Sequence, residues 1–350
     1  MLFRFIHTAD LHIGMAASGL GEAGGRVRAA RLESLEKLLE IARDADAHAI
    51  LIAGDLFDDN QVDPDQVEKA AGLLNDRSAI PTYIVPGNHD PYTRDSVFRR
   101  PIWGQLKPHI HVLTQPEPVE LGPDAILYPC PLARKHGAED PTRWIPPRRG
   151  ESIRIGMAHG SMKIRPDVGD DDFPIPLETA ATRQLDYLAL GHWHSRLSHP
   201  FDNAQARTWY CGSHETTKFG EAGSGSALSV TLEGNDSPPA VEPIDCGVLT
   251  WCDRTVDLSG ASLTDVMREL REMPGAETTL LRMRLTGRMP ADEPVTVDDL
   301  RRAAENRFLA CRIDAAQLVP PRVEEGLDDL LASPYLIETA RALEQIAAEP

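Results

Sequence analysis

The feature that most constrains this chain is a series of short apolar runs, each ending abruptly in a turn that carries Asp, Asn or His. In YIVPGNHDPYT (83–93), the apolar residues stop at Val85, Pro-Gly turns the chain, and Asn88, His89 and Asp90 follow. Asn, Asp and Pro-Gly are common in ordinary surface turns, because these side chains bond to nearby backbone. Taken alone, this stretch is therefore more often a plain turn than a functional site.

Four further runs end in the same way, and in three of them a glycine lies directly beside the Asp or His. In an open α/β sheet, the loops at the carboxyl ends of the strands converge on one crevice. Carboxylate and amide oxygens and imidazole nitrogens are ligands of divalent metals. The five turns together therefore predict a metal site, although each alone has a structural reading as a turn or a helix cap. The residues that follow the other four runs are Asp10 and His12, Asp55 with Asp58 behind it, His159, and His192 with His194.

The order of elements predicts an α/β layered fold. Strands alternate with amphipathic helices up to residue 85, and Asp63 with Pro64 marks the start of the second helix. Between residues 115 and 235 helices are sparse and short strands dominate, which predicts a second sheet packed on the first. The expected strands of the first part are 2–6, 48–55 and 82–85, and its first helix is 26–44.

The C-terminal third reads as a smaller unit. Residues 233–243 are rich in Pro and polar residues and are expected to be a linker. A strand, helix, strand, helix, strand pattern then runs to about residue 318, and the tail carries apolar residues at helical spacing. The expected domains are 1–240, 245–320 and a helical tail, 321–350.

Composition limits the partners and the compartment. An apolar fraction of 41% over 350 residues is that of a globular protein, and the net charge of −18 argues against a chain coated in positive charge. Nucleic acid would have to be contacted through local patches or bound cations. The five cysteines form no Cys-x-x-Cys pair, so we expect reduced thiols and no structural zinc site. With no leader-like or membrane-spanning run, a cytoplasmic protein is expected.

The five turns resemble the signatures of calcineurin-like metallophosphoesterases. Within that superfamily, HTADLHIG, GDLFD, GNHDPY, GHWHS and the segment YCGSHETTKFGE (210–221) are most similar to SbcD-type DNA double-strand-break repair nucleases. The resemblance covers residues 1–235. It implies a sandwich of two β-sheets flanked by helices, followed by a small α/β capping domain that contacts DNA.

The resemblance also implies a site with two divalent metal ions, most often Mn²⁺, with Fe²⁺ or Zn²⁺ in some relatives. Asp55 would bridge the two ions. His89 would face the scissile phosphate and protonate the leaving oxygen, while Asp90 would hold His89 in orientation. The remaining ligands implied are Asp10, His12 and His194 for the first ion, and Asn88, His159 and His192 for the second.

The implied function is manganese-dependent DNA hydrolysis in repair, by exonuclease and single-strand endonuclease activity. Some members have His in place of Asp58, which leaves the balance of the two activities open. The implied partners are DNA, a second copy of the chain and an SbcC-like coiled-coil ATPase on the tail, although that tail could equally pack on its own domain. Substrate contacts are expected from Asp58, Arg94, Arg99, Arg100 and His214.

Two other functions stay open from the sequence. A phosphatase or phosphodiesterase acting on nucleotides would use the same metals. A scaffold without catalysis can also keep this fold, although all seven implied ligands and His89 are present here.

Overall fold

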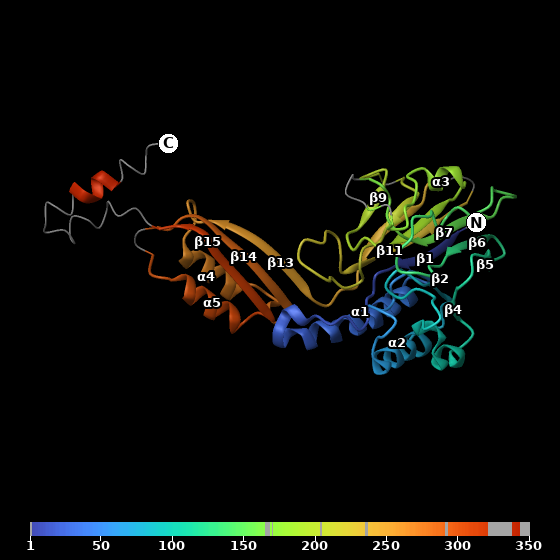
Figure 1. Cartoon of the computed structure of the whole chain (residues 1–350), viewed down its shortest axis with the longest axis horizontal. Coiled ribbons are helices and arrows are strands. Elements are labelled where there is room, and N and C mark those ends of the chain that lie inside the picture. The colour runs from blue at the N-terminus through green and yellow to red at the C-terminus, as the bar shows by residue number, and fades with distance from the viewer. Residues whose placement is uncertain are drawn as a thin grey trace. The chain divides into compact units, whose positions relative to one another are not determined.

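The structure is a computed structural model, and it describes residues 2–164, 169, 171–203, 205–234, 237–290, 293–320 and 338–343 (Figure 1). The chain divides into two compact units, Met1–Thr250 and Trp251–Pro350. Each unit is described by itself.

The first unit contains a six-stranded sheet in the order β12-β11-β1-β2-β3-β4. The strands β1 to β4 are parallel, with Ile6 opposite Ile50 and Ile52 opposite Ile84, and α1 and α2 connect the first three. The elements are β1 Phe3–Thr8, α1 Gly24–Asp44, β2 Ala49–Ala53, α2 Pro64–Asp76, β3 Thr82–Val85, β4 Ile110–Val112, β11 Ser226–Leu232 and β12 Ala240–Asp245.

A second six-stranded sheet has the order β5-β6-β7-β8-β10-β9. Its central strands β6, β7, β8 and β10 are parallel. The described part of 115–235 holds a single short α-helix, as expected. The elements are β5 Val119–Gly122, β6 Ala125–Cys130, β7 Ile153–His159, α3 Thr179–Thr182, β8 Tyr187–Gly191, β9 Leu197–His199 and β10 Thr208–Tyr210; short 3₁₀ helices span Ser18–Ala23, Val97–Arg99 and Pro101–Gln105.

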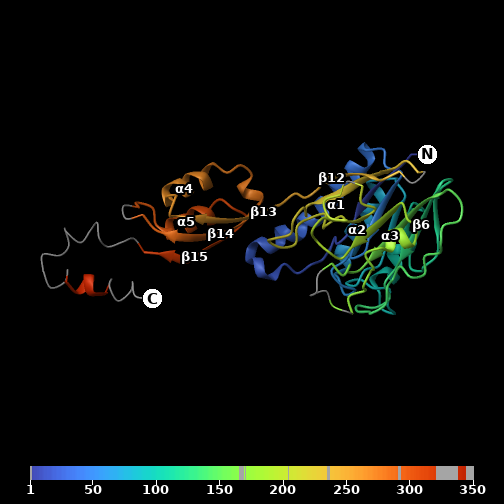
Figure 2. The same cartoon turned by 90° about the horizontal axis from the view of Figure 1, so that it is seen from above.

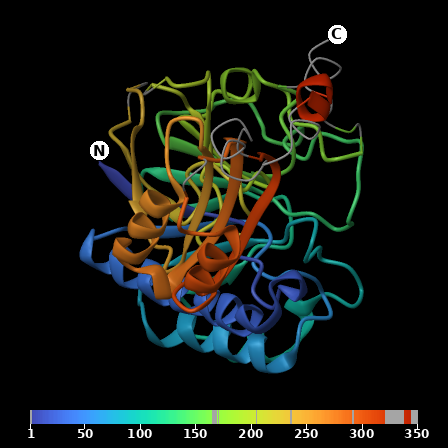
Figure 3. The ribbon, with the colours of Figure 1, turned by 90° about the vertical axis from the view of Figure 1, so that its left-hand side faces the viewer.

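The two sheets pack face to face, and helices cover the outside of the first. Alternate residues of β1 and β2, such as Phe5 and Leu51, meet Leu127 and Ile155 of the second sheet. The other faces of these strands pack on α1 and α2, which lie side by side (Figure 3). Because the strands are buried on both faces, they appear in the sequence as continuous apolar runs. The predicted sandwich of two sheets flanked by helices is confirmed.

In the second unit, the described residues include a three-stranded sheet, β13-β14-β15, with the helices α4 and α5 packed against it (Figures 1 and 2). The order of elements is the expected strand, helix, strand, helix, strand. Ser262 and Thr296 cap the two helices through their hydroxyl oxygens. The elements are β13 Thr250–Asp257, α4 Leu263–Glu272, a 3₁₀ turn Ala276–Thr278, β14 Thr279–Arg288, α5 Val297–Glu305 and β15 Ala310–Val319.

The segment expected to be a linker is partly a strand. Ala240–Asp245 forms β12 and pairs antiparallel with β11, so the linker prediction is wrong for 240–243. Pro243 is the misleading signal: a proline cannot donate to the sheet, but an edge strand tolerates it. The first unit consequently runs to Thr250, beyond the expected boundary.

The expected tail domain, 321–350, lies outside the described residues except for 338–343. All five cysteines are free. In the described ranges, no helix is both long and apolar enough to cross a bilayer.

Candidate metal centre

All seven predicted metal ligands come together at the carboxyl ends of β1, β2, β3, β7 and β8. Three groups have ligand atoms within 4.8 Å of one another, and Asp10, His12 and Asp55 each belong to two of these groups. Asn88 Oδ1 lies 2.8 Å from His159 Nε2 and 3.1 Å from His192 Nδ1. The three groups are Asp10, His12 and His194; His12, Asp55 and His89; and Asp10, Asp55 and His159.

Four of these ligands have a left-handed backbone, which is rare for residues other than glycine. The φ angles are 55° at Asp10, 43° at His12, 52° at Asp55 and 106° at His192. Such residues cluster at functional sites, where the surrounding fold over-determines the conformation. Gly87 adds a close approach, because a Cβ at this position would collide with the Asp55 carboxylate. The chain is therefore bent sharply just where each strand delivers its ligand.

The first ligand set consists of Asp10, His12 and His194, and two of its imidazole nitrogens face each other. His12 Nε2 and His194 Nε2 are 3.0 Å apart. The other nitrogen of each ring faces an acceptor: His12 Nδ1 lies 3.2 Å from Asp58 Oδ1, and His194 Nδ1 lies 2.9 Å from Glu221 Oε1. If these outer nitrogens carry the protons, two lone pairs point at each other. A cation between them would convert this repulsion into binding.

The second ligand set consists of Asn88, His159 and His192. Around His159, lone pairs again face one another without a proton between them. Its Nδ1 donates to the backbone carbonyl of Ala53 at 2.9 Å, so Nε2 of the neutral ring is a lone pair. That lone pair faces the Asn88 Oδ1 atom and, at 3.2 Å, the Asp55 Oδ2 atom. Asp55 Oδ2 is buried and accepts no hydrogen bond within the described part of the chain. These donor atoms fit a divalent cation.

The electrostatics of the centre point the same way. Burial by itself lowers the pKa of His159, but the Asp55 and Asp10 carboxylates and the bond to the Ala53 carbonyl together raise that pKa to about 9. For Asp55, burial alone would raise the pKa, yet His159, with His12 and His89, holds it well below its ordinary value. Without metal, a proton on His159 therefore supplies the positive charge that the centre requires.

His89 lies beside Asp55 with its ring fixed. Its backbone N–H donates to Asp55 Oδ1 at 2.9 Å, and its Nδ1 donates to the carbonyl of Asp58 at 2.8 Å. The ring also meets that of His12 edge to face, with centroids 4.7 Å apart. Within the described ranges, this arrangement leaves His89 Nε2 without a hydrogen-bond partner, so it can exchange a proton with a bound phosphate ester.

Asp90 does something different from what the resemblance implies. Its two carboxylate oxygens accept hydrogen bonds from the backbone N–H of Gly87 at 2.7 Å and of Phe57 at 3.0 Å. Burial and the nearby Asp55 charge raise the pKa of Asp90 to about 7. The Asp58 carbonyl, and not Asp90, orients the His89 ring, while Asp90 ties the two ligand loops together.

The expected substrate contacts differ in their surroundings. Arg94 is exposed, Arg99 stacks on Tyr92 at 4.0 Å, and Arg100 donates to the carbonyl of Val62 at 2.8 Å. Asp58 is engaged with His12. The prediction that His214 contacts substrate is wrong: the residue is 0% exposed, and its Nε2 bonds to the carbonyl of Arg31 at 2.8 Å. A histidine in a polar, glycine-flanked segment gives no sign of this burial.

Three functional contacts could not be assigned from the sequence. Arg31 is fully buried and donates to the carbonyls of Leu11 at 2.6 Å and Asp10 at 3.3 Å, so it holds the first ligand loop. Its signal is a charged residue on the apolar face of α1. Glu221 and Asp172 orient His194 and His192. Glu221 closes the segment 210–221, and nothing near Asp172 distinguishes it.

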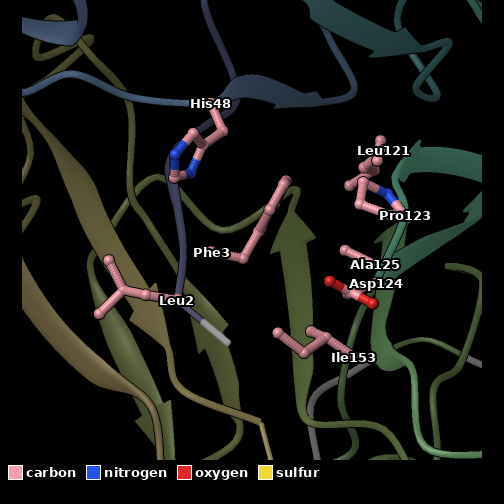
Figure 4. Close-up of a pocket in the computed structure, with 9 residues that line it drawn as sticks. Leu2, Phe3, His48, Leu121, Pro123, Asp124, Ala125 and Ile153 are labelled. Carbon is pink, nitrogen blue, oxygen red and sulfur yellow. The ribbon is translucent and has the colours of Figure 1, made fainter.

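A cavity of about 250 Å³ lies elsewhere, at the amino ends of β1, β6 and β7 (Figure 4). Phe3 stacks on His48 there, with ring centroids 5.4 Å apart, and Asp124 is also in its lining. The metal ligands lie at the opposite, carboxyl ends of β1 and β7, so this cavity is separate from the metal centre.

Parallel strands that deliver carboxylates, an amide and histidines to one edge of a two-sheet sandwich define a metal-dependent phosphoesterase. The calcineurin-like phosphoesterase family model matches residues 3–196, and the chain belongs to that family. This match identifies the family and does not distinguish the SbcD-type subgroup within it.

Two solved structures are similar at low sequence identity. One is a protein of Thermus thermophilus, at 12% identity and a TM-score of 0.43, with 70% of this chain and all of that chain covered. The other is a putative 5'-nucleotidase from Staphylococcus aureus in complex with alpha-ketoglutarate, at 13% identity and a TM-score of 0.40, with 70% of this chain and 54% of that chain covered.

Proposed function

We propose that this protein is a metal-dependent DNA nuclease of the SbcD type that hydrolyses phosphodiester bonds at its two-metal centre. The observation that carries the proposal is the placement of His89, whose ring is fixed beside both ligand sets with Nε2 free. Two further features support DNA as the substrate: the motif resemblance, and a second compact α/β unit that follows the phosphoesterase unit, as a capping domain does.

The residues that would hold two divalent ions are the seven ligands, with Asp55 between the sets. Mixed oxygen and imidazole ligands suit manganese. When bound, such an ion pair polarises the phosphate and lowers the pKa of a bound water.

His89 is the side chain that would donate a proton in the reaction. Its Nδ1–H is committed to the Asp58 carbonyl, so the protonated ring can present Nε2–H to the departing sugar oxygen. The bond to that carbonyl fixes the plane of the ring, and the bond from the His89 N–H to Asp55 Oδ1 fixes its backbone relative to the Asp55 carboxylate. General-acid catalysis by a positioned side chain contributes typically about 10²–10⁴-fold.

The test is a set of parallel assays with manganese. Wild-type protein is incubated with labelled single- and double-stranded DNA and with bis-p-nitrophenyl phosphate, beside His89→Ala. The proposal expects both DNA and the small diester to be cut by wild type, with end-labelling to reveal polarity. Cleavage of the small diester without DNA would refute the nuclease assignment. Absence of cleavage with every divalent metal would favour a scaffold.

The partners are also proposals. We infer that DNA binds to the first unit. A second copy of the chain and an SbcC-like coiled-coil ATPase are the proposed assembly partners of the protein. The segment expected to meet the ATPase, 321–350, is described only at 338–343. Co-elution of full-length protein with such an ATPase, lost on truncation at residue 320, is the corresponding test.

A further inference from the structure

Each ligand set contains one histidine of the Gly-His-Trp-His turn, and a different carboxylate contacts each of these two rings. His194 Nδ1 lies 2.9 Å from Glu221 Oε1, and His192 Nε2 lies 2.9 Å from Asp172 Oδ2. The two rings therefore use opposite nitrogens: His194 presents Nε2 to the centre, whereas His192 presents Nδ1. A carboxylate on the far nitrogen of a ligating histidine fixes both its tautomer and its orientation.

The backbone anchors Asp172 from both sides. The carbonyl of Asp172 accepts from Ser161 N at 3.1 Å, and its neighbour Phe173 donates to the carbonyl of Gly137 at 2.8 Å. The hydroxyl of Ser161 donates to Asp172 Oδ2, and the indole N–H of Trp193 donates to that hydroxyl at 3.1 Å. The carboxylate is thus held at His192 by contacts from several separate segments.

The two supports differ in exposure and the two ligand sets differ in charge. The Glu221 side chain is 4% exposed, while that of Asp172 is 33% exposed. The first set contains the Asp10 carboxylate, whereas the second has the neutral amide of Asn88. Fewer charged ligands and a more hydrated support both lower cation affinity.

We propose that Asp172 is the positioning residue for His192 and selectively controls the affinity of the second metal, which is the weaker of the two. Glu221 has the corresponding role for His194 and the first, tighter metal. The inference rests on the metal-binding part of the proposed function and is independent of the substrate.

The proposal predicts that Asp172→Asn lowers the affinity of the weaker site about 10–100-fold and leaves the tighter site unchanged. Glu221→Gln is the matched variant and is expected to lower the affinity of the tighter site. Ser161→Ala removes one bond to Asp172 but keeps the carboxylate, so it should give a smaller shift in the same direction as Asp172→Asn.

The experiment is a titration of full-length metal-free protein with Mn²⁺, followed by calorimetry and by electron paramagnetic resonance. Wild type should take up two equivalents, and the signal of a coupled manganese pair should appear with the second. In Asp172→Asn that signal should need about 10–100-fold more free Mn²⁺. An equal loss at both sites, or no loss at either, overturns the proposal. Failure of wild type to bind two ions would instead refute the two-metal function itself. If Asp172→Asn does not fold by circular dichroism, Ser161→Ala decides.

Discussion

Acid is expected to destabilise the first unit through two histidines that the fold buries without a charge. His7 and His214 are both 0% exposed, and burial lowers the pKa of each to about 3. His7 Nδ1 lies 3.0 Å from the Tyr187 hydroxyl, and Arg31 adds its positive charge near His214. Neither environment accommodates an imidazolium, so both rings are neutral in the folded protein.

The sign and size follow from proton linkage. The unfolded histidine has a pKa of about 6.5, so below this pH the unfolded state binds more protons than the folded state. The contribution to stability is complete above about pH 6.5 and is lost as the pH falls toward 3. Between pH 8 and pH 5, one such histidine lowers the free energy of unfolding by about 2 kcal/mol, and two lower it by about 4 kcal/mol. A typical domain has only about 5–15 kcal/mol in total.

The assay is urea unfolding at pH 8 and pH 5, with a chelator present so that metal binding does not contribute. Tryptophan fluorescence reports mainly the first unit, which holds four of the five tryptophans. His7→Gln and His214→Gln should each lose about 2 kcal/mol of the difference between the two pH values, whatever their stability at pH 8. His136→Gln, at an exposed position, is the control and should behave as wild type. Buried variants with an unchanged pH dependence would refute the reasoning.

Three other predictions concern the metal centre. His89→Ala should keep both metal equivalents by elemental analysis while turnover of a small diester falls about 10²–10⁴-fold; Asp55→Ala should lose metal, and equal loss in the two variants would contradict the division of roles. Gly87→Ala should weaken metal binding and cost about 1–3 kcal/mol of stability in thermal unfolding, because its Cβ collides with the Asp55 carboxylate. Arg31→Met leaves buried carbonyls without a donor and should cost about 3 kcal/mol or more in urea unfolding; full recovery by Arg31→Lys would show that the guanidinium fork is unimportant.

The elements of the fold could be predicted because buried strands and helices have characteristic patterns of apolar residues. Parallel strands covered on both faces are short apolar runs, as in β2, and amphipathic helices place leucines at helical spacing, as in α1. β12 escapes prediction because an edge strand has one exposed face and tolerates proline, so its composition is that of a linker.

The metal ligands could be predicted from the sequence for a similar reason: each one lies just after a strand, so the topology gives its place in the fold. The contacts that orient those ligands could not be predicted. His89 is oriented by a backbone carbonyl of Asp58, which no side-chain pattern can reveal. Asp172 reaches His192 from 20 residues away. Asp90 does lie beside His89, but the direction of its carboxylate depends on where β2 ends relative to β3.

The position of the centre at the ends of buried strands also has an energetic reason. A left-handed backbone at a residue other than glycine costs on the order of 1–3 kcal/mol, and four ligands have one, so the combined cost approaches the stability of a typical domain. The fold offsets this by continuing the β1–β2 pairing past the strands: Asp10 N donates to the Gly54 carbonyl at 3.1 Å, and His12 N donates to the Asp55 carbonyl at 3.0 Å. The loops after β1 and β2 are held rigid because they continue the pairing of two strands that are buried on both faces. A ligand loop carried by an exposed edge strand would have no such support, because the strain would be released by local unfolding.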